Sequence, residues 1–280
     1  MDGLTHEGRN YLKRKLSHLL FEMLEYPQKK EMLYLGICYC QLARRHPLFV
    51  VPLEELRKCL SRYLIDFDRY PWRDYLLEWE FFLLQEGEDF QIRGKEIINY
   101  KPNEGCSVRI DIHYKGILDV NICERIFRYW FLTKKWDRFL PPSKGWEVIK
   151  NAVILLNEGL YSETLFYLED YLPLIKETDE LLMYRVLRSL STIGELVELR
   201  RGEEALKEIA VLGDFLKDFK NDLKRTPYNF KKLRKNLSKL GANLYRNNFL
   251  VGNLLYLEEK KGKPLGERVK KFLKWLPIFR

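Results

Sequence analysis

Apolar residues recur at three- and four-residue steps along most of the chain, and this spacing predicts amphipathic helices. The clearest stripe runs through Tyr11, Leu12, Leu16, Leu19, Leu20, Met23 and Leu24. Similar stripes predict further helices over 29–45, 53–64, 71–84, 146–158, 161–176, 179–201, 203–225 and 227–245, with proline or glycine near most of their ends. The pattern therefore predicts a mainly α fold.

One segment departs from this period. From Val108 to Lys115 apolar and polar residues alternate, which indicates a half-buried strand. Lys115 and Gly116 form a candidate turn into a second short strand over 117–120, so we expect a small β-hairpin insertion near 107–120. The segment divides the chain into an N-terminal helical region (1–100), the insertion with an aromatic and basic helix (101–145), and a C-terminal helical-repeat region with a basic end (146–280).

Helix ends in the C-terminal region look alike. The segments 155–159 and 198–202 each end a helix at a glycine, and Arg246-Asn247-Asn248 follows at a comparable distance. Gly159 and Gly202 are the expected left-handed caps of the preceding helices. Regular turns of this kind predict antiparallel helix pairs in a solenoid-like stack, because one pair alone cannot bury its apolar face.

Two resemblances follow from these turns. Residues 156–165 and 200–206 share the order helix, glycine, short polar step, helix, which resembles the middle of tetratricopeptide-like repeats. Residues 146–219 are also similar to a small all-helical family of uncharacterised function, through Asn157-Glu158-Gly159, Leu168-Glu169-Asp170 and Arg200-Arg201-Gly202. Leu165-Phe166 stand where that family has His-Glu, so the resemblance implies helical-hairpin packing and carries no functional residue over.

Composition narrows the class of protein. The chain of 280 residues is 46% hydrophobic and contains no apolar run of 18 residues and no N-terminal export signal, so we expect a globular, cytoplasmic protein without integral membrane insertion. The charged fraction of 32% is typical of thermophilic proteins. Five scattered cysteines without a CxxC pair predict buried thiols, and we expect neither disulfides nor a metal site.

Catalytic motifs are scarce. The sequence contains no phosphate-binding glycine loop, no HExxH helix and no GxSxG elbow, and only four histidines. The sharpest enzymatic hypothesis is a metal-dependent hydrolase at Asp111 and His113, which alternate with Arg109 and Lys115 on one face of the expected strand. A solvated strand face explains the same pattern, so we assign no catalytic residue, metal or cofactor.

Positive charge is concentrated at the C-terminal end. The net charge of the whole chain is +9; residues 201–280 hold 20 Lys or Arg against 9 Asp or Glu, whereas residues 1–200 have a slight acidic excess. A ridge of cations can follow a phosphate backbone with salt-sensitive affinity, and a solvated surface explains the same charges. The candidate nucleic-acid-binding residues are Lys224, Arg225, Lys231, Lys232, Arg234, Lys235, Lys239 and Arg246.

The last fifteen residues predict a basic amphipathic helix. Its apolar stripe, a candidate partner-binding face, consists of Val269, Phe272, Leu273 and Leu276. Such a helix can dock in the groove of a partner or lie on an anionic membrane, and it can also cap the end of its own helical stack. The sequence as a whole favours a non-catalytic helical-repeat module that binds or scaffolds a protein partner. A nucleic-acid-binding protein is the first alternative and the hydrolase the second, and the oligomeric state is left open.

Overall fold

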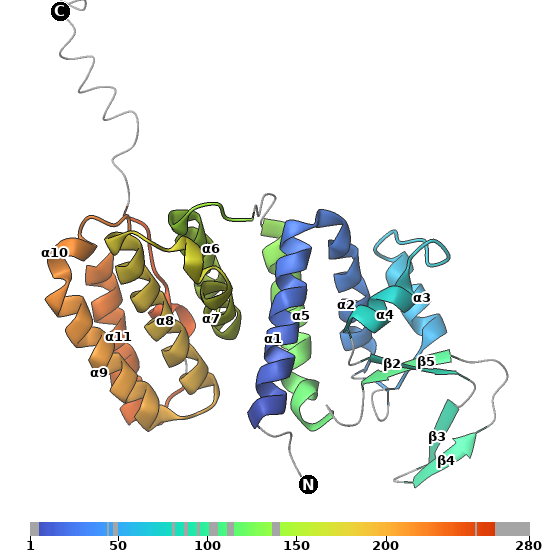
Figure 1. Ribbon diagram of the computed structural model, residues 1–280. Helices are drawn as coiled ribbons and strands as arrows, with labels where there is room; N and C mark the ends of the chain where they lie inside the picture. The colour runs from blue at the N-terminus through green and yellow to red at the C-terminus, as the bar shows by residue number, and fades with distance from the viewer. Residues whose placement is uncertain are drawn as a thin grey trace, which may run out of the picture. The chain divides into compact units, whose positions relative to one another are not determined.

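The structure is a computed structural model that describes residues 6–43, 45–46, 50–79, 82–86, 89–93, 96–100, 106–110, 115–135, 141–249 and 251–260. It is mainly helical, as the periodicity predicts (Figure 1). The chain divides into two compact units, Met1–Pro141 and Pro142–Arg280. The finer division of the first 145 residues stays a prediction. None of the helices in the described ranges is long and apolar enough to cross a membrane.

The first unit is built around a central buried helix, α2. The elements of the unit are α1 (His6–Glu25), η1 (Pro27–Lys30), α2 (Glu31–Ala43), β1 (Val51–Pro52), α3 (Leu53–Ser61), α4 (Trp72–Trp79), β2 (Phe82–Glu86), β3 (Asp89–Arg93), β4 (Glu96–Tyr100), β5 (Cys106–Ile110) and α5 (Lys115–Lys135). Helices α3, α4 and α5 all contact α2. Buried Trp79 donates its indole N–H to the Met32 carbonyl at 3.4 Å. Gly36 admits this ring and Ile126, since a Cβ there would lie 3.2 Å from both side chains.

The strands correct two sequence predictions. Residues 82–84, which were expected to end the helix over 71–84, lie in β2. Residues 117–120, which were expected to be the second strand of a hairpin, lie in α5. Strand β5 instead pairs antiparallel with β2 and β1, in the order β1-β5-β2, with Leu84 opposite Val108. Strands β3 and β4 form a separate antiparallel pair that the sequence analysis did not predict. A short apolar run suits either a helix or a strand, and pairing with β5 decides between them.

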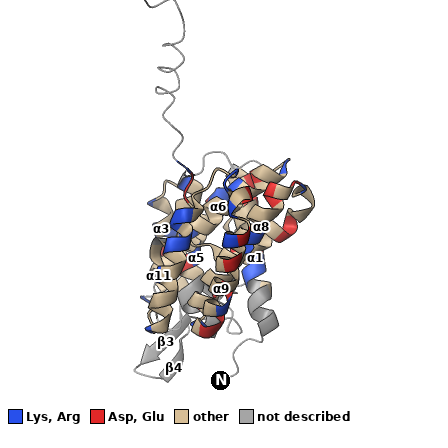
Figure 2. Ribbon diagram, turned by 90° about the vertical axis from the view of Figure 1, so that its left-hand side faces the viewer, with Lys and Arg blue, Asp and Glu red and all other residues tan. Residues whose placement is uncertain are grey.

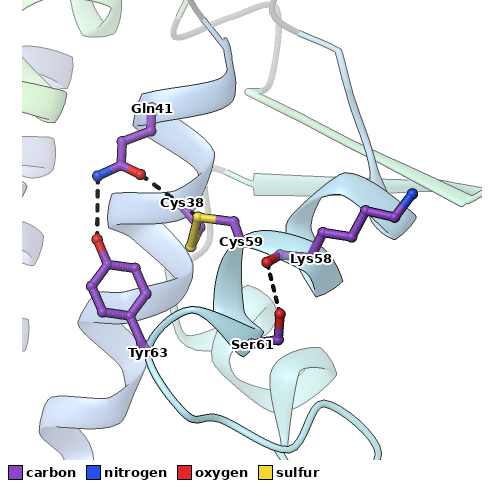
Figure 3. Close-up of a disulfide and its surroundings, with 6 residues drawn as sticks. All are labelled: Cys38, Gln41, Lys58, Cys59, Ser61 and Tyr63. Carbon is purple, nitrogen blue, oxygen red and sulfur yellow. Dashed lines mark hydrogen bonds between the residues drawn. A yellow bond between two sulfur atoms is a disulfide. The ribbon is translucent and has the colours of Figure 1, made fainter.

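The expectation of free thiols is wrong at four cysteines. Cys38 is bonded to Cys59 and Cys40 to Cys123, with Cα atoms 5.7 and 5.5 Å apart. Residues two apart on a helix point to different faces, so Cys38 meets α3 whereas Cys40 meets α5. Figure 3 shows the first bond beside Gln41, whose amide donates to the Tyr63 hydroxyl at 3.2 Å. The two disulfides therefore tie the central helix to two of its neighbours.

The second unit is a run of helices that contact one another in chain order. They are α6 (Gly145–Asn157), α7 (Tyr161–Asp170), η3 (Leu172–Leu174), α8 (Thr178–Glu198), α9 (Gly202–Asp218), α10 (Lys220–Leu223), α11 (Phe230–Tyr245) and η4 (Gly252–Leu255). Contacts join α6 to α7, α7 to α8, α8 to α9 and α9 to α11, and α6 also touches α8. Neighbouring helices lie side by side in this unit (Figure 1). The helix predicted over 203–225 is divided into α9 and α10.

Three turns of this unit share one hydrogen-bonding pattern. Gly159, Arg200 and Asn247 have φ values of 74°, 57° and 55°, and each donates its backbone N–H three residues back. The next residue in each turn donates five residues back, which defines a Schellman cap. The expected left-handed cap at Gly159 is confirmed. The one expected at Gly202 is wrong, because Arg200 takes that conformation and Gly202 begins α9.

A candidate anion-binding pocket

A pocket of about 690 Å³ opens in the second unit between the end of α9, α10 and the first turns of α11. We call it the cationic pocket because six of its lining residues are cationic: Lys220, Lys224, Lys231, Arg234, Lys235 and Lys260. Among the described residues that line it there is no aspartate or glutamate. Elsewhere basic and acidic residues are interspersed over the helices (Figure 2). The pocket therefore concentrates one sign of charge, which raises the local concentration of anions.

Helical periodicity places three of these cations together. Lys231, Arg234 and Lys235 are three and four residues apart on α11, so they share one face. The opposite face is buried through Leu233, Leu237, Leu240 and Leu244. Asn229 caps the helix, since its side-chain oxygen accepts from the Lys232 N–H at 3.2 Å. The first turn of α11 contains no acidic residue, so the positive end of the helix dipole adds to the charge of its side chains.

The last described segment returns to the pocket and completes it. Asn157 of α6 holds the Leu257 peptide, accepting from its N–H at 2.9 Å and donating to its carbonyl at 3.2 Å. The chain then pairs with the start of α11, where the Asn229 N–H donates to the Glu258 carbonyl at 2.8 Å. Two residues later Lys260 reaches the pocket, and its ammonium donates to the carbonyls of Lys224 and Thr226. Lys260 is thus held by backbone oxygens, which leave its charge in place.

An ion pair with a carboxylate neutralises a lysine that lies beside the pocket. Lys232, which is next to the pocket on α11, forms an ion pair with Glu258. Lys224 donates to the neutral amide of Asn221 at 3.1 Å. Within the described parts of the chain, no ion pair joins a carboxylate to any of the six cations of the pocket. An incoming anion would therefore compete with water and neutral amide groups, and with no carboxylate of those parts.

The floor of the pocket is apolar. Leu216, Leu223 and Tyr228 are each 1% exposed, and Phe230 is half-buried at the start of α11. Burial raises the pKa of the Tyr228 hydroxyl to about 12, and the negative charge of Glu259 adds to the effect. Tyr228 is therefore neutral at physiological pH. The pocket combines a cationic rim with an apolar, partly aromatic floor.

The structure brings together four of the eight predicted nucleic-acid-binding residues. Lys224, Lys231, Arg234 and Lys235 line the pocket. Lys232 is paired with Glu258, and the remaining three lie outside the lining: Arg225, Lys239 and Arg246. Lys220 and Lys260 also line the pocket and were not among the eight candidates. Lys220 lies in the same basic stretch of sequence, whereas the turn that brings back Lys260 leaves no signal in local spacing.

The other sequence candidates do not form a described site. Arg109 lies in β5, Asp111 and His113 lie outside the described residues, and Lys115 begins α5. The prediction that Lys115 shares a strand face with Arg109 is wrong. Within the described ranges no three His, Cys, Asp or Glu side chains gather as a metal site would require. The candidate partner-binding face, Val269, Phe272, Leu273 and Leu276, lies outside the described residues.

The chain is distantly similar to a protein from the genus Aquifex. An uncharacterized protein from Aquifex aeolicus (strain VF5) is 26% identical over 254 residues, which cover 89% of this chain and 78% of that protein. No protein-family model matches the chain. No solved structure matches it either. The site must therefore be interpreted from its own chemistry.

Proposed function

We propose that this chain is a helical binding module that holds the phosphate backbone of a nucleic acid in the cationic pocket. The observation that carries the proposal is the gathering of six cations around one pocket without a lining carboxylate in the described chain. Arginine and lysine are the side chains that bind phosphate, because their donors match its oxygens and their charge offsets its own. The activity we propose is binding, and it requires no catalytic residue.

We further propose that the second unit is a solenoid-like stack of helix pairs, similar to tetratricopeptide repeats in its general design. Its Schellman turns at Gly159, Arg200 and Asn247 are 41 and 47 residues apart, and helices adjacent in the sequence contact one another. Such a stack gives a ligand a preformed surface. The pocket lies at the last of these helix pairs, between α9 and α11.

Salt dependence tests the proposal. If four to six cations each displace a counterion, affinity falls roughly 10²- to 10³-fold between 50 and 200 mM salt. Fluorescence anisotropy with a labelled oligonucleotide of about 20 nucleotides measures this slope. Reversal of three pocket charges, in Lys231→Glu/Arg234→Glu/Lys235→Glu, should abolish most of the binding and flatten the slope.

A second triple variant provides a control with the same change in net charge. Arg225→Glu/Lys239→Glu/Arg246→Glu reverses three cations of the same basic region that do not line the pocket. It should retain most of the affinity, and melting curves should show that both variants are folded. Equal losses in the two triple variants would mean that overall charge, and not the pocket, is responsible. Salt-independent or undetectable binding by the unmodified chain would refute the proposed function.

A further inference from the structure

We infer that the pocket receives an unpaired base, so that the ligand is a single-stranded nucleic acid and not a duplex. This inference rests on the proposed function. It deepens that proposal because phosphate binding alone explains the cationic rim but not the apolar floor. Both features belong to one pocket.

Among the described apolar residues that line the pocket, Phe230 is the one with an exposed surface, because Leu216, Leu223 and Tyr228 are each 1% exposed. Leu216 of α9, Leu223 of α10 and Tyr228 of the following loop are buried, and Phe230 opens α11 beside them. An aromatic ring in a basic groove is the arrangement on which unpaired bases stack, whatever their sequence. Phe230 is only half-buried, so part of its surface is open to contact. Phe230 is therefore the residue on which we expect the base to stack.

The rim and the floor together favour a single strand. Lys231, Arg234 and Lys235 come from the same helix as Phe230, within five residues of it. A base on the floor would therefore lie within a short distance of cations that can hold its flanking phosphates. The pocket volume of about 690 Å³ is within the range of small-molecule sites, which suits one nucleotide and is too small for a duplex.

A duplex could reach the floor only at a cost. Its bases are paired and stacked, and moving one of them into a pocket requires that both interactions be broken. A single strand pays little of this cost. Stacking of one base on an aromatic side chain contributes roughly 5- to 100-fold in affinity. That factor is the expected gain of a single strand over a backbone that has no bases.

The experiment compares a single strand with an abasic strand of the same backbone charge, and both with a duplex. Anisotropy between 50 and 200 mM salt measures binding of four labelled ligands: a single strand, an abasic strand of equal length, the corresponding duplex, and poly-glutamate. We expect the single strand to bind at least five-fold more tightly than the abasic strand. Phe230→Ala and the milder Phe230→Leu should lower single-strand affinity to the abasic level, with the abasic affinity and the salt slope unchanged.

Tyr245→Ala serves as the matched control, because Tyr245 is an aromatic residue of the same helix, is 79% exposed and does not line the pocket. It should bind both strands as the unmodified chain does. Equal, salt-sensitive binding of single, abasic and double strands would overturn the single-strand inference and leave the proposed function standing. No salt-sensitive binding to any of the three would overturn both. Equally tight binding of poly-glutamate would overturn both in favour of an acidic protein partner.

Discussion

Replacing Gly194 by alanine should destabilise the second unit, because α8 packs directly on a ring of α7 at that point. A Cβ on Gly194 would lie 2.4 to 2.6 Å from three ring atoms of Tyr161, whereas ordinary contacts are 3.4–4 Å. Tyr161 is 7% exposed and has little room to retreat. Either the ring or the whole of α8 must move by about 1 Å.

The expected loss follows from two opposing terms. Overpacking of a buried site costs about 1–3 kcal/mol and sometimes more. Alanine recovers up to about 1 kcal/mol over glycine in a helix interior. Because the Cβ would clash with three ring atoms, the cost of overpacking lies at the upper end of its range. We expect a net loss of about 2 kcal/mol, which for a unit of this size lowers the melting temperature by roughly 6–8 °C.

Gly213 separates the two terms, because it also lies inside a helix, α9, and a Cβ there would meet nothing within 4 Å. Gly213→Ala should therefore stabilise the unit by up to about 1 kcal/mol. Urea unfolding followed by circular dichroism measures both variants. Hydrogen exchange of the α7 and α8 amides identifies the unit that responds.

A double-mutant cycle isolates the contact itself. In a Tyr161→Ala background the ring is absent, so Gly194→Ala should cost nothing or become stabilising. Unfolding of Gly194→Ala at the same urea concentration as the unmodified chain would contradict this prediction. An equal loss of stability with and without the Tyr161 ring would contradict it as well.

Three further predictions concern other parts of the chain. Two non-glycine residues adopt the left-handed conformation: Leu64, at φ 61° and 95% exposed, and Arg200, at φ 57°. Leu64→Gly and Arg200→Gly should each raise the free energy of unfolding by up to about 1 kcal/mol, because glycine adopts this conformation without strain. A urea titration that shows a loss of stability at both sites would be inconsistent with this prediction. The loops closed by the disulfides span 83 and 21 residues, so Cys40→Ser/Cys123→Ser should cost about 4 kcal/mol and Cys38→Ser/Cys59→Ser about 3 kcal/mol; four free thiols by peptide mapping of the unreduced protein would refute the pairing. The pKa of Tyr228 is about 12 in the folded chain and about 10 when unfolded, so its contribution to stability is complete below pH 10 and is lost as the pH rises to 12. In urea titrations, the free energy of unfolding of Tyr228→Phe should therefore fall less steeply between pH 10 and 12 than that of the unmodified chain. Identical pH profiles of the two proteins would contradict the assignment.

Local pattern predicted the helices well and the strands poorly. The helices over 146–158 and 227–245 appear within three residues of the expected bounds, as α6 and α11, because each buries a continuous apolar stripe. Residues 82–84 and 117–120 were assigned to the wrong class of secondary structure. Runs of three or four apolar residues suit both structures, and strand partners lie too far along the chain for periodicity to reveal them.

The candidate site also contains residues that local sequence predicted and residues that only tertiary contacts bring in. The shared face of Lys231, Arg234 and Lys235 follows from helical spacing, and the sequence predicted it. Lys260 and Leu216 join the pocket only because the chain folds back on itself. Whether a cation is neutralised also depends on tertiary contacts, since Lys232 has a partner, Glu258, that is 26 residues away.

The sequence by itself determined that the protein is mainly helical and that its excess of positive charge lies in the last 80 residues. Both are properties of neighbouring residues, which periodicity and composition record. The tertiary structure decided which cysteines are bonded, which turns adopt the left-handed conformation, and which cations surround an apolar floor. These features depend on contacts between residues that are tens of positions apart in the sequence. Forming such contacts costs chain entropy, which the burial of apolar residues in the helical core offsets.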